Sequence, residues 1–161
     1  MSRAASPQDN VPRYTLCLVS HSNSPPLRPE PAFQFDLHSV PNPPRAMRQA
    51  MTGKHRDLQT ALLQDTAFCA ELNRAYGIIK AAMTEFELSR RRPPPHRPTA
   101  PSTTEQDPDV LLVGCFCSKG KHRSPAFVES LVETEEWPST WHVKAIHREL
   151  DDVTDKDNHY E

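Results

Sequence analysis

The chain has 161 residues, a formal net charge of −2, 17 prolines and 4 glycines. This length supports one domain with a real core, and the small net charge gives no general attraction to nucleic acid, so any anion site has to be local. No apolar run is long enough to span a bilayer, and residues 1–10 lack the apolar core of a signal peptide, which together favour a cytoplasmic protein without a membrane partner.

The cysteines and histidines give no sign of a metal centre. The four cysteines, Cys17, Cys69, Cys115 and Cys117, lie mostly in apolar segments. Their spacing matches neither a disulfide framework nor a zinc site, so we expect reduced thiols. The histidines show no metal-ligand spacing either. We therefore predict no metal site and no cofactor.

Two strands are predicted in the first part of the chain. After a disordered tail over residues 1–12, the run Arg13–Ser20 is typical of a buried strand, and residues 21–26 form the loop at its carboxyl end. Residues 32–38 alternate apolar and polar side chains and predict a second strand. The prolines within residues 40–44 then fix a rigid turn.

Three helices are predicted to follow. A short helix covers residues 45–51, and a second runs from a cap at Asp57 through Leu63. The longest begins at Asp65 or Thr66, and its apolar side chains recur every three or four positions, which gives it one core face. The next segment, residues 90–108, is rich in arginine and proline and is predicted to be a mobile insert inside the domain.

The segment that follows the insert predicts a strand, a basic loop and a helix. Val110–Cys117 is a continuous apolar run, as in a strand of a parallel sheet that is buried on both faces. Ser124 is predicted to cap the next helix, with Pro125 in its first position. Unpaired N–H groups at this helix start favour a bound phosphate. The loop adds the basic side chains of Lys119, Lys121, His122 and Arg123.

A last strand is predicted over residues 140–146, which delivers His147 and Arg148 to its carboxyl end before an acidic tail over residues 152–161. The expected fold is a single α/β domain, residues 13–151, with a small, mostly parallel sheet of about four strands and flanking helices. Because the carboxyl ends of parallel strands meet at one edge, the polar groups gathered there predict a ligand pocket.

The basic loop also fits the signature of a cysteine-dependent phosphatase. Residues 117–124 read Cys, two residues, Gly, two residues, Arg and Ser. In that chemistry Cys117 is a thiolate nucleophile at a helix N-terminus, Arg123 clamps the phosphoryl oxygens, and Ser124 assists the departure of the thiol.

Other features of this segment depart from the phosphatase signature. Phe116 stands where the signature has His, and the loop side chains are large enough to fill the cradle. Asp107 and Asp109 are the candidate general acids, but neither lies in a recognisable acid loop. We therefore expect Cys117 to be a small buried packing residue or a pocket-wall residue rather than a nucleophile.

Four separated segments resemble the C-terminal domain of the RNase adapter protein RapZ family. They occur in the same order and at similar spacing, namely Phe35–Pro43, Met51–Gly53, Cys117–Ser124 and His147–Asp151. The segments that they resemble are Phe-Asp-x-Arg-Phe-x-Pro-Asn-Pro, Thr-Gly, Gly-Cys-Thr-Gly-Gly-Lys-His-Arg-Ser and His-Arg-x-Leu-Glu. Departures are His38, Phe116 and Lys119, which stand where the family has Arg, Gly and Gly. Without the family's N-terminal nucleotide-binding domain, the chain resembles a stand-alone eukaryotic form.

The resemblance implies an α/β domain that senses an amino-sugar phosphate, glucosamine-6-phosphate, and that in bacteria also binds small RNA and forms oligomers. Carried over to this sequence, it implies that the ligand-binding residues are Asp36, Asn42, Thr52, Gly53, Cys117, Ser118, Gly120, Lys121, His122, Arg123, Ser124, His147 and Arg148. To these we add His38 and Lys119, which depart from the family but lie in the same segments. Arg123 is the principal phosphate ligand that we expect. Asp36 either contacts the sugar or pairs with Arg123 or Arg148.

Three functions stay open from the sequence. The favoured one is non-catalytic binding of a phosphorylated metabolite in a sensing or adaptor role. The second is the cysteine-dependent phosphatase. The third is an RNA-binding adaptor that uses Lys119, Lys121 and the run Arg90–Arg92. A second copy of the chain is a further candidate partner.

Overall fold

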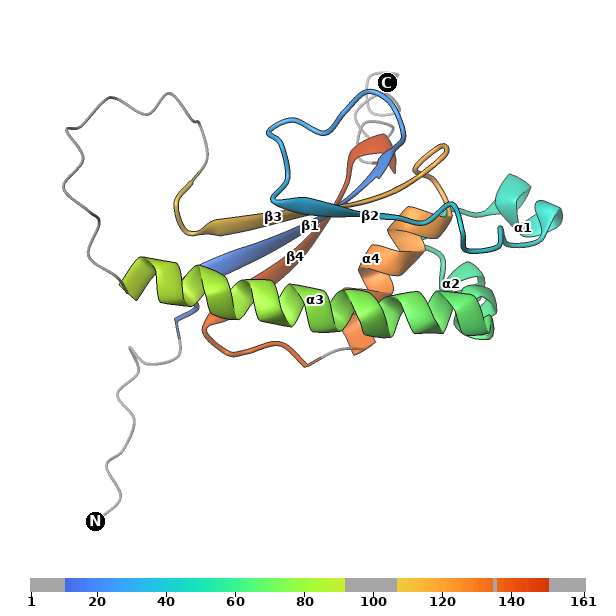
Figure 1. The fold of residues 1–161 in the computed structure, drawn as a ribbon. Coiled ribbons are helices and arrows are strands. Elements are labelled where there is room, and N and C mark those ends of the chain that lie inside the picture. The colour runs from blue at the N-terminus through green and yellow to red at the C-terminus, as the bar shows by residue number, and fades with distance from the viewer. Residues whose placement is uncertain (1–10, 92–106, 135, 151–161) are drawn as a thin grey trace, which may run out of the picture.

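A single parallel sheet organises the fold in this computed structural model, which describes residues 11–91, 107–134 and 136–150 (Figure 1). Its four strands stand in the order β2-β3-β1-β4, and every neighbouring pair is parallel. The strands are β1 (Tyr14–Ser22), β2 (Phe33–Asp36), β3 (Val110–Cys117) and β4 (Trp141–His147). The α/β prediction is confirmed, and the described sheet is wholly rather than mostly parallel.

The helices are α1 (Arg45–Ala50), α2 (Arg56–Leu63), α3 (Thr66–Arg91) and α4 (Arg123–Thr134). The predicted start of α3 is confirmed, because the Phe68 N–H donates to the Asp65 carboxylate at 3.0 Å. The predicted cap of α2 is wrong. Its N-cap is His55, and Asp57 instead lies in the first turn, where a negative charge suits the helix dipole.

The start of α4 also differs from the prediction. The helix begins at Arg123, because the His122 carbonyl accepts the first helical hydrogen bond from Ala126 at 3.1 Å. Ser124 is therefore inside the helix, not its cap. Its hydroxyl donates to the His21 carbonyl at 3.4 Å, which ties α4 to β1. Pro125 falls in the first turn, where its missing N–H has no helical partner to lose.

Three strands differ in their boundaries from those predicted. β4 runs one residue further than predicted and includes His147, which pairs with Ser20 of β1. β1 continues through His21 and Ser22, because its pairing with β3 extends to the pair Ser22–Cys117. β2 is shorter than residues 32–38, and its pairing with β3 ends at Asp36. The helix α3 includes Arg90 and Arg91, which were assigned to the insert. The rest of that predicted insert up to residue 106, and the predicted tails apart from residues 11 and 12, lie outside the described residues.

The connections between strands explain why the helices share one face of the sheet. Right-handed crossovers put connections that run in opposite directions along a sheet on opposite faces. The β2–β3 and β3–β4 connections run in one direction and carry α3 and α4, whereas residues 23–32 run back from β1 to β2 on the other face (Figure 1). The carboxyl ends of β1 and β3 therefore form a switch point, where ligands of open α/β sheets bind.

The main core lies between the sheet and the helices. The predicted face of α3 is confirmed, and its buried residues are Phe68, Leu72, Ala75, Ile79 and Met83. They pack with Leu16 and Leu18 of β1 and with Phe127 and Leu131 of α4. On the opposite face, Leu27 covers a smaller cluster around Cys17 and Val19. None of the described helices has the length and apolar character to cross a membrane.

Candidate functional site

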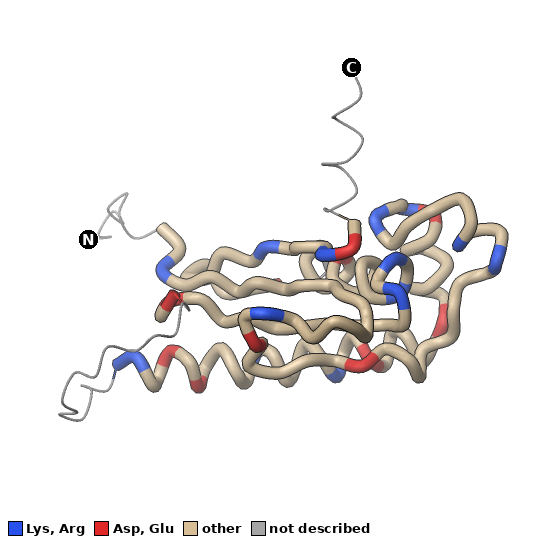
Figure 2. Tube along the Cα trace, turned by 90° about the horizontal axis from the view of Figure 1, so that it is seen from above, with Lys and Arg blue, Asp and Glu red and all other residues tan. Residues whose placement is uncertain are grey.

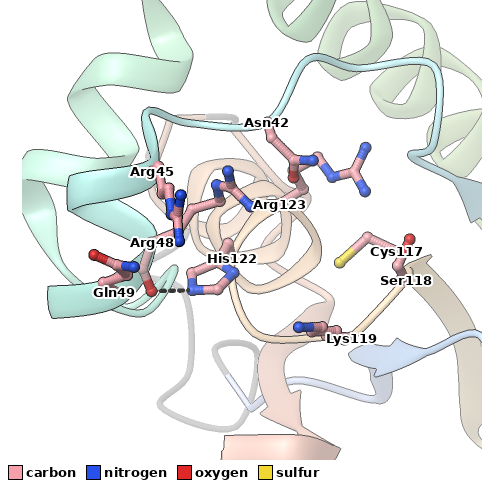
Figure 3. Close-up of a pocket in the computed structure, with 9 residues that line it drawn as sticks. All are labelled: Asn42, Arg45, Arg48, Gln49, Cys117, Ser118, Lys119, His122 and Arg123. Atoms are coloured by element: carbon pink, nitrogen blue, oxygen red, sulfur yellow. Dashed lines mark hydrogen bonds between the residues drawn. The ribbon is translucent and has the colours of Figure 1, made fainter.

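A hollow of about 310 Å³ opens beside the carboxyl end of β3 (Figure 3). Its walls come from the segment that contains α1, from the end of β3 with the following loop, and from the start of α4. The lining residues are Asn42, Arg45, Arg48, Gln49, Cys117, Ser118, Lys119, His122 and Arg123. The hollow therefore lies at the carboxyl edge of the sheet, between the segment that follows β2 and the loop that follows β3.

Gly120 lets the loop fold back over the end of β1. Its φ angle is +68°, a conformation that other residues rarely adopt. A Cβ atom at this position would also lie 2.7 Å from the carbonyl carbon of His21 and 2.7 Å from the nitrogen of Ser22. The loop can hold this path only with glycine at residue 120. Gly120 thus shapes the wall of the hollow without lining it.

The segment that contains α1 forms the opposite wall of the hollow, and hydrogen bonds and close backbone packing fasten it to the start of α4. The Gly53 N–H donates to the Lys121 carbonyl at 2.8 Å. A Cβ atom at Gly53 would lie 2.3 Å from the His122 carbonyl oxygen, so the backbone of Gly53 packs directly on the start of α4. The His122 ring donates from Nε2 to the Arg48 carbonyl at 2.8 Å (Figure 3). These contacts place α1 across the hollow from the loop.

Arg123 lines the hollow and also joins α4 to the segment that follows β2. Its side chain is 7% exposed, and Nη1 donates to the carbonyl oxygens of Leu37 at 3.2 Å, His38 at 3.3 Å and Val40 at 2.9 Å. Within the described part of the chain, its Nε and Nη2 make no hydrogen bond. One side of the guanidinium thus holds the fold while the rest remains for a ligand.

The hollow carries a strong positive charge. Arg45, Arg48, Lys119 and Arg123 line it, and its lining contains no carboxylate. None of these four side chains forms a salt bridge with a residue that the structure describes. Figure 2 shows Lys and Arg positions gathered at the end of the molecule that contains α1. A site of this kind attracts an anion.

Two histidines at this edge have pKa values below their ordinary value of 6.5. Burial is the main cause of the lowered pKa of His21, and the nearby Arg148 adds to it. Burial also lowers the pKa of His122, and the positive charges of Arg48, Lys121 and Lys119 lower it further. Because a carbonyl oxygen accepts from Nε2 of His122, its Nδ1 is the acceptor in the neutral ring.

These histidines predict a loss of stability in mild acid. The unfolded chain takes up protons on them near pH 6.5, while the folded chain does so only at lower pH, so the free energy of unfolding falls as the pH drops below that value. We expect urea denaturation to give a lower free energy of unfolding at about pH 5.5 than at about pH 7.5. The variant His122→Gln should show a shallower dependence. A stability that is flat or rises toward pH 5.5 would contradict this expectation.

Six of the residues that the sequence analysis proposed as ligands line the hollow: Asn42, Cys117, Ser118, Lys119, His122 and Arg123. The remaining nine proposed ligands do not line the hollow: Asp36, His38, Thr52, Gly53, Gly120, Lys121, Ser124, His147 and Arg148. The residues proposed as ligands are thus divided between the lining of this hollow and positions outside it.

Asp36 pairs with its neighbour His38 rather than with an arginine. Its carboxylate accepts hydrogen bonds from the backbone N–H and the ring of His38. Burial raises the pKa of Asp36, but those hydrogen bonds and the charges of His38 and Arg123 outweigh it and hold the pKa below its ordinary value of 3.8. Asp36 thus makes no hydrogen bond to Arg123 or Arg148, and the pairing predicted as one alternative is wrong. Arg123 is nevertheless close enough for its charge to lower the pKa of Asp36.

His147 and Arg148 are engaged in contacts between elements of the fold. The ring of His147 lies 2.7 Å from the Ser20 hydroxyl and 2.7 Å from the Glu129 carboxylate, and Ser20 itself is fully buried. Arg148 donates to Glu149 at 2.9 Å and to the Ser22 hydroxyl at 3.1 Å. Both residues thus fasten the end of β4 to its neighbours.

The contribution of α1 to the hollow was not predicted from the sequence. Arg45, Arg48 and Gln49 line the hollow, but none was proposed as a ligand. The sequence does show two arginines three residues apart in a short helix after a proline turn, which indicates paired charge on one helix face but not its position beside the loop. Met47 is partly buried against the core, while Arg45 and Arg48 form no salt bridge with a described residue, so their charges are available for a site.

The candidate general acids lie at the wrong end of β3. Asp107 and Asp109 precede this strand of eight residues, whereas the loop follows it. A strand of that length separates its two ends by roughly 25 Å. Neither aspartate can therefore donate a proton to a group bound at the loop.

The two basic groups proposed for RNA are also far apart. Arg90 lies at the end of α3 that faces the start of β3, away from the loop (Figure 1). Its guanidinium stacks 3.5 Å from the ring centre of Phe86 and donates to the Pro108 carbonyl. Arg92 is outside the described residues. The described arginines of this run and the loop lysines do not form one continuous surface.

Comparison with protein-family models gave no match, and comparison with curated proteins gave none either. Among residues 11–91, 107–134 and 136–150, no three His, Cys, Asp or Glu side chains come together as a metal site. The chemistry of the hollow follows from its own side chains. It offers fixed positive charges, the start of a helix and a thiol.

Proposed function

We propose that this chain binds a phosphorylated small molecule in the hollow and acts as a sensor or adaptor rather than through catalysis. One observation carries the proposal. At the carboxyl edge of a parallel sheet, four basic side chains line a hollow that contains no carboxylate, beside the first turn of α4. Phosphate groups are favoured there by charge-assisted hydrogen bonds and by unpaired N–H groups of the helix.

The resemblance to the RapZ C-terminal domain supports an amino-sugar phosphate as the first ligand to test. Its loop segment Cys117–Ser124 supplies residues to the hollow, and so does Asn42 of the Pro-Asn-Pro segment. Glucosamine-6-phosphate would place its phosphate on this loop and its sugar toward the polar side chains of Asn42 and Gln49.

A thermal-shift screen with inorganic phosphate, glucosamine-6-phosphate and nucleotides tests the proposal. A ligand at a hundredfold excess over its dissociation constant adds about 2.7 kcal/mol to the stability of the folded state. We expect such a rise for the wild type, a smaller one for Lys119→Ala, and an undiminished one for the control Arg91→Ala. Lys119 lines the hollow, whereas Arg91 ends α3 far from it. The absence of a rise with any phosphate compound would contradict the proposal.

A cysteine-dependent phosphatase is the second candidate, and one contact favours it. The sulfur of Cys117 lies 3.3 Å from the Ser124 hydroxyl, and Cys117 lines the hollow. By turning its hydrogen from the His21 carbonyl to the sulfur, the hydroxyl would stabilise a leaving thiolate. Release of phosphate from p-nitrophenyl phosphate, lost in Cys117→Ser, would favour this candidate. Ligand binding without phosphate release would remove it.

A further inference from the structure

The basic side chains of the hollow form two separate groups on facing walls. Lys119 and Arg123 belong to the loop and the start of α4, which we call the loop wall. Arg45 and Arg48 belong to α1, which we call the α1 wall. Figure 3 shows the α1 side chains on the left, Cys117, Ser118 and Lys119 on the right, and His122 between them. An anion held by one wall thus faces further positive charge on the other.

The charge of a single phosphate does not balance this site. A phosphate monoester carries about −1.5 to −2 charges near neutral pH. The two walls together present four positive charges, and no described residue neutralises them through a salt bridge. The carboxylate of Asp36 acts on Arg123 at a distance but is bonded to His38. Two phosphate groups, with about −3 to −4 charges, match the walls.

The α1 wall has an unfavourable arrangement of charge without a ligand. Arg45 and Arg48 are three residues apart on a helix, where like charges repel, and α1 contains no acidic residue. Arg48 is nevertheless oriented, because its Nε donates to the Pro43 carbonyl at 3.0 Å. The α1 wall thus keeps repelling charges beside the hollow, as expected for a wall that receives an anion.

The spacing of the two walls is fixed before any ligand binds. The His122 ring joins the start of α4 to the Arg48 carbonyl at 2.8 Å, and Gly53 joins the end of the α1 segment to the Lys121 carbonyl at 2.8 Å. Two groups of charge held at a set distance favour a ligand that has two anionic groups, because little order has to be created on binding.

We propose that the ligand of this hollow carries two phosphate groups, one bound by the loop wall and one by Arg45 and Arg48 of the α1 wall. This inference rests on the proposed function, because it names the class of ligand for the same hollow. The two phosphates are joined either directly, as in a diphosphate, or through a carbon skeleton, as in a bisphosphate.

Isothermal titration at constant ionic strength, in a buffer without Mg²⁺, tests the inference. The probes are inorganic phosphate, pyrophosphate and fructose 1,6-bisphosphate. We expect at least one of the two doubly phosphorylated probes to bind at least about tenfold more tightly than inorganic phosphate. The probe that binds more tightly shows how the phosphates are joined: directly if it is pyrophosphate, or through a carbon skeleton if it is fructose 1,6-bisphosphate.

Variants of each wall separate the two sites. The double variant Arg45→Gln/Arg48→Gln should lose the tenfold preference while it keeps its affinity for inorganic phosphate, because neither side chain is fully buried and neither forms a salt bridge with a described residue. Lys119→Gln should weaken all three probes, and Arg91→Gln should change none. Circular dichroism confirms that each variant is folded.

The inference and the proposed function fail in different ways. If phosphate binds but neither doubly phosphorylated probe gains tenfold, the two-phosphate inference is overturned and phosphate binding stands. The same holds if the double variant keeps the preference of the wild type. If no probe binds and the thermal-shift screen also gives no response, the proposed function fails.

Discussion

Replacing Gly53 with alanine is expected to destabilise the protein by about 3 kcal/mol or more, the upper end of the cost of overpacking. The new Cβ atom would lie 2.3 Å from the His122 carbonyl oxygen, 2.4 Å from the Ala126 nitrogen and 2.8 Å from the Pro125 Cβ. Those first two atoms form the opening hydrogen bond of α4, and both belong to the backbone. No rotamer change relieves the contact, so α4 or the turn before α2 has to move. Urea denaturation followed by circular dichroism measures the loss.

Gly77 provides the matched control for this substitution. It lies inside α3, and a Cβ atom there would meet no other atom within 4 Å. Gly77→Ala is therefore expected to stabilise the protein by about 1 kcal/mol, because alanine is the better helix former. If Gly53→Ala behaves like Gly77→Ala, then the close packing of Gly53 on α4 does not exist in solution.

Replacing Arg123 with alanine is expected to cost about 3 kcal/mol or more of stability even when no ligand is present. The substitution removes a charged donor from the carbonyl oxygens of Leu37, His38 and Val40. Leu37 and Val40 are buried, so water cannot readily replace that donor. The segment after β2 should loosen, and the free energy of unfolding in urea should fall.

Arg56→Ala is the comparison for Arg123→Ala. Arg56 pairs with Glu133 at 3.0 Å, but its side chain is 75% exposed, and exposed pairs contribute about 1 kcal/mol or less. An Arg123→Ala variant no less stable than Arg56→Ala would refute the structural role of the guanidinium. Because Arg123→Ala changes the fold as well as the site, a loss of ligand binding in that variant alone says little. The ligand tests therefore use Lys119, Arg45 and Arg48.

The arrangement of elements could be predicted from the sequence because its signals are local. The apolar run Val110–Cys117 predicted a strand of a parallel sheet, and the period of apolar residues predicted α3. The cap of α4 was mispredicted because the hydroxyl of Ser124 has a partner in β1, more than a hundred residues away in the chain. The strand order β2-β3-β1-β4 depends on such distant contacts, and no local pattern encodes it.

The candidate site was predictable only in part for the same reason. The loop residues Lys119 and His122 were found because they are contiguous with a strand and a helix. The roles of Gly53 and Arg123 in packing depend on which backbone atoms the fold brings against them. Arg45 and Arg48 were missed because nothing in the sequence places α1 opposite the loop.

The helix α1 contributes charge to the hollow while burying none of its own side chains. Most of the stability of the domain comes from the core beneath the sheet, to which α3 and α4 contribute the buried side chains. Substitutions on the exposed face of α1 can therefore accumulate without endangering folding. A lineage could change the ligand of this domain by altering one short helix while keeping the sheet, the loop and the core. Affinity and foldability can thus evolve separately in this protein.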